Sequence, residues 1–311
     1  MIAQETRAGR QEISTAPFFQ INVIADYGGG RLPDHAFNEV ETRLRSKLGS
    51  SENVSLTVTS HPVHAYATIE TGFWIAQIAL ENTHPGLIIF SNTAPRGEDE
   101  ASSNAGVTWQ GDERQPFVFV QLDNGVPIFA VHTGHNLSFI KGRAKEIRKV
   151  NVPNVGTQFR SRDIYTGAVA AYIQGDLSVI GGDLIDPRTI PDVPANRVAT
   201  IDGYGNLKTT IRKSAVSKDM LQSPFVEVQC NGRRHFAVNT LAAGVEGEKG
   251  QLCLTTGSSG EEKNPFLEVI RLQQKANEDF RIGEVSDDLP PITIKPLPRV
   301  IFAETKLIPS S

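Results

Sequence analysis

Two short segments, on either side of a proline-rich joint, carry side chains that could bind a ligand. The first reads Phe-Arg-Ser-Arg-Asp-Ile-Tyr over residues 159–165 and leads into an alanine-rich run at residues 168–173. The second reads Ile-Asp-Gly-Tyr-Gly-Asn-Leu over residues 201–207. In the first segment, an arginine beside a serine hydroxyl can hold an anion. In the second, a tyrosine face offers a stacking surface, and an asparagine carboxamide supplies both a hydrogen-bond donor and an acceptor.

Two further polar residues follow predicted strands near the start of the chain. An apolar run over residues 18–26 ends at Asp26, before a glycine turn, and a run over residues 86–91 is followed by Asn92. In sheets with parallel strands, ligands bind beside the carboxyl ends of the strands. A carboxylate at such a strand end can accept charge-assisted hydrogen bonds. Taken alone, Asp26 is more typical of an ordinary turn at a strand end, and the series of motifs described below reverses that preference.

The elements that position these residues alternate between strands and helices. Strands are predicted at residues 18–26, 54–60 and 86–91. The helix that begins at Asp34 carries its apolar residues at a spacing of three to four, from Phe37 to Leu48. A second helix is predicted from Tyr66 to Leu80. This order predicts an α/β N-terminal domain with a mostly parallel sheet, followed by an Asn-Gly hairpin at residues 116–132.

A proline-rich joint separates this region from a second predicted domain. Residues 186–196 hold three prolines, and the short β-like runs that follow predict a small all-β, barrel-like C-terminal domain. The predicted organisation is a mobile leader at 1–17, an α/β domain at 18–190, a β-barrel domain at 196–295 and an extended tail at 296–311. The polar stretch at 92–115 is long for a loop, which indicates a functional or disordered segment.

Composition and charge argue against several classes of function. The chain has 311 residues and a formal net charge of −4. It has no block of like charges, which argues against a nucleic-acid surface. No run approaches the roughly 18 apolar residues of a membrane span. The two cysteines, Cys230 and Cys253, do not indicate a disulfide scaffold and favour a reduced, cytoplasmic protein.

Two histidine pairs at a spacing of three invite a metal interpretation: His61 with His64, and His132 with His135. No third ligand pattern accompanies either pair, and such pairs in loops are mostly structural or solvated. We therefore predict no metal site.

Taken together, the motifs resemble the S-adenosyl-L-methionine hydroxide adenosyltransferase family, which also contains the fluorinase and chlorinase enzymes. In that family the first block reads roughly F-H-G-R-D-I-F or F-Y-S-R-E, and the second reads I-D-x-F-G-N-L-x-T-N-I. The likeness runs in motif order through residues 18–295. It implies S-adenosylmethionine as substrate, with no cofactor. It also implies a homotrimer, with the substrate bound between the first domain of one subunit and the second domain of its neighbour.

The resemblance gives four of the candidate residues a binding role. Asp26 corresponds to the aspartate that accepts hydrogen bonds from both ribose hydroxyls. Tyr66 stands where some relatives place an aromatic ring against the ribose, and it is equally compatible with a core aromatic at a helix start. Tyr204 corresponds to the ring that lies against the adenine. Asn206 corresponds to the asparagine that binds the amino acid group of methionine.

The segment over residues 256–260, Thr-Gly-Ser-Ser-Gly, resembles the part of the family that holds the methionine carboxylate. Ser258 is the counterpart of a serine that contacts this carboxylate. Ser259 stands where some relatives carry an arginine, so an ionic contact is lost. An ordinary glycine-serine loop would account for the same residues.

The residues at the reacting centre depart from the family pattern. In the hydrolytic branch an aspartate, an arginine and a histidine surround the attacking water. Here Asn92 replaces the aspartate, Arg114 is kept and Arg160 replaces the histidine. Asn92 cannot act as a carboxylate base, and the Arg160 guanidinium stays charged. Ser161 stands where the fluorinase has a serine that contacts fluoride, and with the arginines it can hold an anion.

Two functions follow from this pattern, with a third as the bland alternative. The first is transfer of the adenosyl group at C5′ to water or a small anion, with release of L-methionine. The second is a catalytically degenerate protein that binds S-adenosylmethionine or adenosine. The third is a divergent fold with no adenosyl ligand. The kept arginine, with Arg160 and Ser161, favours the enzyme.

Overall fold

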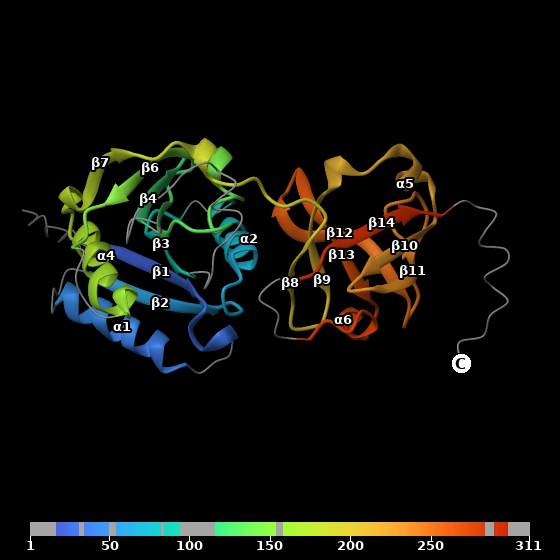
Figure 1. The fold of residues 1–311 in the computed structure, drawn as a ribbon, viewed down its shortest axis with the longest axis horizontal. Coiled ribbons are helices and arrows are strands. Elements are labelled where there is room, and N and C mark those ends of the chain that lie inside the picture. Colours follow the sequence, from blue (N-terminus) through green and yellow to red (C-terminus); the bar gives the residue numbers. More distant parts are fainter. Residues whose placement is uncertain are drawn as a thin grey trace, which may run out of the picture.

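The computed structural model describes residues 17–30, 34–49, 54–81, 84–93, 116–153, 158–283 and 289–297. Strands in these ranges form two sheets of seven strands each, one from residues 18–184 and the other from residues 198–296 (Figure 1). The expected leader and tail lie almost wholly outside the described residues, as do residues 94–115 of the polar stretch. Within the described part of the chain, no helix is long and apolar enough to cross a membrane.

The first sheet has the strand order β2-β1-β3-β5-β4-β6-β7. Its strands are β1 (Phe18–Ala25), β2 (Ser55–Pro62), β3 (Leu87–Asn92), β4 (Phe117–Leu122), β5 (Pro127–Val131), β6 (Ala144–Val150) and β7 (Ile180–Leu184). The register places Ala25 of β1 opposite both Pro62 and Asn92. The carboxyl ends of β1, β2 and β3 therefore lie side by side at one edge of the sheet.

This sheet is mixed, so the prediction of a mostly parallel sheet is wrong. The pairs β1–β2, β1–β3 and β3–β5 are parallel, whereas β4–β5, β4–β6 and β6–β7 are antiparallel. The reason lies in the Asn-Gly hairpin, which is confirmed, with Gly125 at a φ of 92°. A short hairpin can join only antiparallel strands. β4 therefore reverses the direction, and β6 and β7 continue the antiparallel half.

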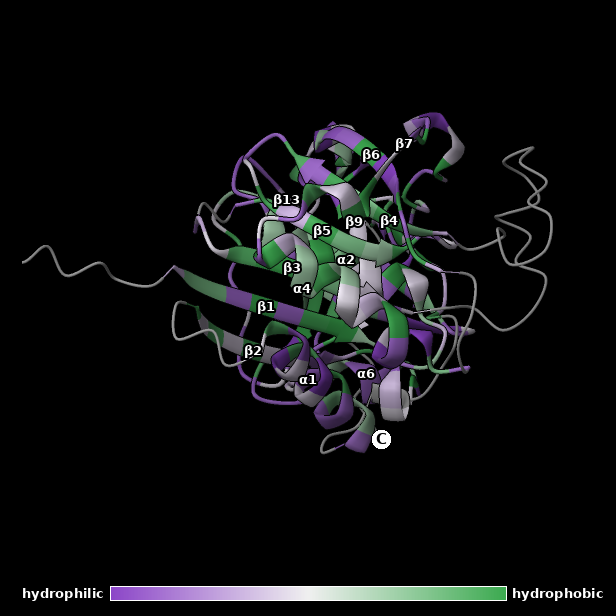
Figure 2. Cartoon of the chain, turned by 90° about the vertical axis from the view of Figure 1, so that its left-hand side faces the viewer, coloured by the Kyte–Doolittle hydropathy of each residue, from purple (hydrophilic) through white to green (hydrophobic). Residues whose placement is uncertain are grey.

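Helices cover both faces of the first sheet. α1 (His35–Leu48) begins at the Asp34 cap, whose side chain accepts a hydrogen bond from the Ala36 N–H at 2.7 Å, and its predicted apolar face is buried. α1 packs against α4 (Thr166–Ile173), which continues a π-helical turn (Ser161–Tyr165). Figure 2 shows hydrophilic residues along α1 and hydrophobic residues along the last part of β1. α2 (Thr68–Ala79) lies on the opposite face of the sheet.

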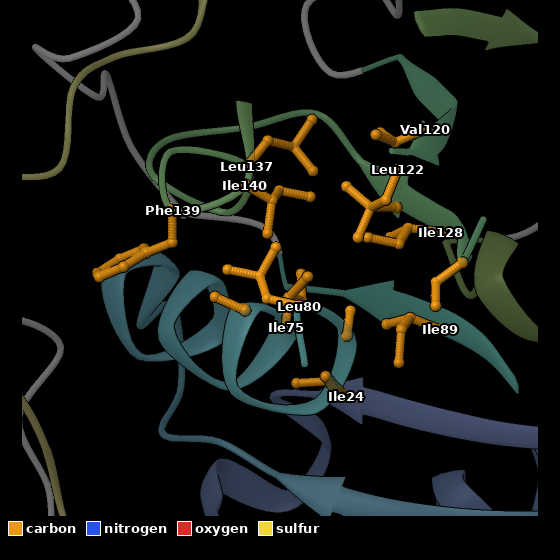
Figure 3. Packing of buried hydrophobic residues seen from close by; sticks show 14 of the residues in the cluster. Ile24, Ile75, Leu80, Ile89, Val120, Leu122, Ile128, Leu137, Phe139 and Ile140 are labelled. Carbon is orange, nitrogen blue, oxygen red and sulfur yellow. The ribbon is translucent and has the colours of Figure 1, made fainter. Parts of the chain in front are cut away.

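The core beneath α2 connects the two sheets. Figure 3 shows Ile75 of α2 and Leu80, which directly follows this helix, packed with strand residues such as Ile24 and Ile89. The same buried cluster includes Ala199 and Phe266, which belong to the second sheet. Burial of each aliphatic side chain contributes about 1.5–3 kcal/mol. α2 is therefore the element through which the two halves of the chain share one core.

The second sheet has the order β14-β10-β11-β12-β13-β9-β8. Its strands are β8 (Val198–Ile201), β9 (Leu207–Arg212), β10 (Phe225–Cys230), β11 (Arg233–Asn239), β12 (Leu252–Glu261), β13 (Asn264–Arg271) and β14 (Ile292–Pro296). Short helices accompany the sheets: α5 (Lys218–Gln222), α6 (Ala276–Asp279) and 3₁₀ turns at Tyr27–Gly30, Lys141–Arg143, Leu177–Val179, Pro187–Thr189 and Lys213–Ala215.

The prediction of a small all-β barrel is also wrong. This half is a mixed seven-stranded sheet that matches the first sheet in strand number, with a parallel pair between β11 and β12. The sheet curls into a half-barrel. Its end strands approach each other at an isolated bridge between Arg197 and Pro291. The many short strands predicted the β character correctly, but strand spacing in the sequence does not specify whether the ends of a sheet pair.

Candidate functional site

Four polar side chains gather at the carboxyl edge of the first sheet: Asp26, Tyr27, Asn92 and Ser161, here called the edge cluster. Asp26 and Tyr27 follow β1, and Asn92 ends the neighbouring strand β3. Ser161 is buried at the start of the π-helical turn that leads into α4. Three of the four are predicted site residues, and the fold brings them to one place from three separate elements.

The Asp26 carboxylate is held by the turn that precedes α2. Its Oδ2 atom accepts a hydrogen bond from the Tyr66 backbone N–H at 3.0 Å. Tyr66 adopts the left-handed conformation, with a φ of 62°, which is uncommon for a residue other than glycine. Sequence reasoning placed Tyr66 at the site through its ring. In the structure its contribution to Asp26 is a backbone donor.

Tyr27 belongs to the edge cluster although sequence reasoning did not select it. Its ring makes edge-on contacts with Phe37 and Phe159, at centroid distances of 4.9 and 5.4 Å. Burial raises the pKa of Tyr27 far above its usual range, and the Ser161 and Asn92 side chains lower it less. The hydroxyl is buried, and no described group meets it with good hydrogen-bond geometry. Sequence reasoning did not select this tyrosine because it directly precedes a run of three glycines, which is typical of a turn.

The Arg160 guanidinium already contacts nearby residues of the same chain. Its Nη2 atom donates to the Pro153 carbonyl at 3.2 Å, and its guanidinium carbon lies 5.4 Å from the centre of the Tyr165 ring. That ring is stacked on Phe117 at 4.0 Å. These contacts hold the Arg160 charge beside Ser161. Arg114, the third residue predicted to act on the nucleophile, lies outside the described residues.

The remaining predicted residues lie in the second sheet. Asp202 organises the turn between β8 and β9: its Oδ1 atom accepts the N–H groups of Tyr204 and Asn206, each at 3.0 Å. Its Oδ2 atom accepts the Asn206 carboxamide at 3.0 Å. The Tyr204 side chain is 80% exposed. This turn therefore holds the backbone of Tyr204 and leaves its aromatic ring exposed.

A buried ion pair lies next to this turn. The Glu268 carboxylate accepts from Lys208 Nζ at 2.8 Å, from the Ser258 N–H at 3.1 Å and from the Ser259 hydroxyl at 3.4 Å. Lys208 is also 3.8 Å from Asp202. Ser258 and Ser259 lie in an irregular stretch of β12 rather than in a loop. Sequence reasoning missed Lys208 and Glu268, whose only signal was a charged residue within a predicted strand.

Two of the histidines considered for a metal site, His61 and His64, make polar contacts with other side chains. His61 Nε2 lies 2.8 Å from Asn22 Oδ1, and burial lowers the pKa values of His61 and His132. His64 pairs with Glu70 at 2.7 Å. Across the described ranges, no three His, Cys, Asp or Glu side chains are grouped so as to hold a metal ion.

One open groove of about 560 Å³ runs along the outer side of α1. Polar side chains line it, including Glu39, Arg43 and Arg162. Arg162 is paired there with Glu39 and with Asp163. Arg162 of the first motif lines this groove. No residue of the edge cluster does, so we do not place the functional site in the groove.

No protein-family model and no curated protein matches the sequence. The fold does match solved structures. An uncharacterized conserved protein from Thermotoga maritima superposes with a TM-score of 0.61 at 18% identity, over 88% of this chain and 99% of the other. A conserved hypothetical protein from Thermus thermophilus superposes with a TM-score of 0.56 at 15% identity, over 89% and 99%. At these identities the likeness concerns the fold alone.

Proposed function

We propose that the protein binds S-adenosylmethionine and transfers its adenosyl group from C5′ to water or a small anion, releasing L-methionine. The observation that carries this proposal is the edge cluster: Asp26, Asn92 and Ser161 come from separate parts of the sequence and meet beside Tyr27. The motif resemblance supplies the substrate. The geometry supports a carboxylate for the ribose next to a group of neutral donors.

The proposed reaction is an in-line displacement. A bond forms between the nucleophile and C5′ while the C5′–sulfur bond breaks, and its electron pair goes to sulfur, which leaves as neutral methionine. The sulfonium already carries the activating charge, so the protein must align the reactants and exclude water. With water as nucleophile a proton must also leave, and neither Asn92 nor Arg160 can accept it.

The donors of the edge cluster favour an anionic nucleophile over neutral water. The Tyr27 hydroxyl is protonated near neutral pH, as any tyrosine with an ordinary pKa is, and burial raises its pKa further. The Tyr27 and Ser161 hydroxyls and the Asn92 carboxamide can therefore donate to one anion. The nearby Arg160 charge adds favourable electrostatics. Displacement by an anion leaves no proton to be removed.

Substrate binding would use both sheets. Asp26 would accept the ribose hydroxyls, and the exposed Tyr204 ring would stack on the adenine. Asn206 and Ser258 would hold the amino acid end. In line with the resemblance, we propose that the two groups of residues meet between neighbouring subunits of a homotrimer.

A protein that binds the ligand without turnover is the second candidate. The observation in its favour is that Arg160, in place of a titratable histidine, is engaged by the Pro153 carbonyl and the Tyr165 ring. Under this second function, the predicted binding residues hold the ligand, and the residues at the reacting centre catalyse no transfer.

One experiment separates these functions. Pure protein is incubated with S-adenosylmethionine, with and without chloride, and methionine, adenosine and any 5′-substituted adenosine are quantified by chromatography. Methionine release with an equal amount of an adenosyl product supports the enzyme. Binding by calorimetry without methionine release supports the second candidate. If the protein shows no binding and no turnover, both candidate functions are refuted.

A further inference from the structure

The buried carboxylate of Glu70 contacts residues of both sheets. Glu70 lies in the first turn of α2 and is 5% exposed. Its Oε2 atom accepts the His64 N–H at 2.9 Å and lies 2.7 Å from His64 Nδ1. Its Oε1 atom accepts the hydroxyl of Thr200, on β8, at 2.6 Å. The first turn of a helix is electrostatically favourable for an acidic side chain.

On the side of the first sheet, Glu70 fixes the turn that holds Asp26. His64 begins this turn, and the Ala67 N–H closes it on the His64 carbonyl at 3.1 Å. Two residues after His64 comes Tyr66, whose left-handed backbone aims its N–H at Asp26. A non-glycine residue persists in that conformation only when its surroundings hold it, because the conformation costs about 1–3 kcal/mol. The Glu70 contacts supply such a constraint.

On the side of the second sheet, Glu70 holds the strand that leads to the Tyr204 turn. Thr200 is 1% exposed and lies two residues before Asp202, whose carboxylate shapes that turn. α2 and β8 are in contact, and Figure 1 shows α2 on the side of the first sheet that faces β8. The same carboxylate therefore touches the supports of both predicted binding regions.

We infer that Glu70 is a positioning residue that sets the Asp26 carboxylate for a ribose diol and ties this setting to the strand carrying the Tyr204 turn. The ligand part of this inference rests on the proposed function. The alternative is a purely structural bond between sheets, which would leave Asp26 unaffected. Charge-assisted hydrogen bonds are about twice as strong as neutral ones. Weakening the hydrogen bonds of the Glu70 carboxylate should therefore allow the turn that begins at His64 to open.

Two variants and a matched control test this role. Glu70→Gln keeps the shape of the side chain and removes its charge. Thr200→Val removes the hydroxyl on the second sheet and keeps the volume. Thr209→Val is the control, because Thr209 is equally buried, on the adjacent strand β9, and its hydroxyl donates to the Leu267 carbonyl at 2.7 Å rather than to Glu70.

The first readout needs no ligand. Amide hydrogen exchange of His64 and Tyr66 should be at least about tenfold faster in Glu70→Gln and Thr200→Val than in the wild type, because opening of the turn becomes easier. The control should leave both rates unchanged. Unchanged exchange in both variants would overturn the inference.

The second readout is the affinity for adenosine, measured by calorimetry. We expect a loss of about tenfold in Glu70→Gln and about threefold in Thr200→Val, with none in Thr209→Val. Faster exchange with unchanged adenosine affinity would overturn the positioning role and leave a structural bond. If the wild type binds neither adenosine nor S-adenosylmethionine, the proposed function fails, and exchange alone still decides whether Glu70 holds the partner of Asp26.

Discussion

Replacing Tyr27 with phenylalanine separates the stability of the edge cluster from its function. The ring contacts with Phe37 and Phe159 remain, so the packing of the cluster is kept. The hydroxyl is buried, and no described group meets it with good geometry. Burying a hydroxyl without a compensating hydrogen bond costs about 1–3 kcal/mol. We therefore expect Tyr27→Phe to leave the free energy of unfolding unchanged or to raise it by about 1 kcal/mol.

Whereas Tyr27→Phe should keep or raise stability, we expect it to lower the turnover number. Loss of one preorganised donor at a reacting centre typically costs about 2.7–4 kcal/mol, or a factor of about 10²–10³ in kcat. Because the Asn92 and Ser161 donors remain, we expect the lower end of this range. Urea unfolding would give the stability, and methionine release from saturating S-adenosylmethionine with chloride would give the turnover.

Tyr172→Phe is the matched control for this prediction. Tyr172 lies in α4, its ring packs against Phe119 and Phe129, and burial alone raises its pKa. Its loss should leave turnover unchanged. A Tyr27→Phe protein that is destabilised by more than 1 kcal/mol while its turnover matches the wild type would refute the argument, because the hydroxyl would then serve the fold and not the nucleophile.

Three further predictions address the same site. Asp26→Ala should weaken adenosine and S-adenosylmethionine binding by about 2 kcal/mol or more, as expected for the loss of charge-assisted bonds to a diol; unchanged affinity by calorimetry would remove Asp26 from the site. Asn92→Asp combined with Arg160→His should raise adenosine formation with water as nucleophile, because a carboxylate and a titratable imidazole return to the reacting centre; a double variant no faster than the wild type would count against this placement. Light scattering should find a trimer of the 33.9 kDa chain, and a stable monomer would leave the proposed pocket half built.

Local patterns predicted the elements around the site well. The Asp34 cap and the apolar spacing from Phe37 onward gave α1, and the Asn-Gly turn gave the β4–β5 hairpin. Two apolar runs that each end in a polar residue placed Asp26 and Asn92 at one edge of the sheet. The helix and the hairpin were predicted because each depends on residues only a few positions apart, whereas Asp26 and Asn92 meet through the pairing of β1 with β3.

The sheet as a whole and two parts of the site depend on distant residues. β6 was missed because its sequence, Ala-Lys-Glu-Ile-Arg-Lys-Val, is mostly charged and is stabilised as a strand by pairing with β4 and β7. The Lys208–Glu268 pair joins residues 60 positions apart, and the Glu70–Thr200 bond joins residues 130 positions apart. No spacing rule reaches that far. In the sequence, no motif links either residue of these pairs to its partner.

The exposed ring of Tyr204 gives a physical reason why binding of the proposed substrate would depend on the proposed homotrimer. Asp202 fixes the backbone on both sides of this residue, so only the side chain remains to be ordered when the ring is covered. Covering about 100 Å² of an aromatic ring at about 25 cal/mol per Å² contributes about 2.5 kcal/mol. That is comparable with the contribution expected from Asp26. A ligand that spans the two residues would therefore gain similar binding free energy from each sheet. An isolated half-site would lose about half of these two contributions, which is a physical reason for the two halves to be brought together before binding.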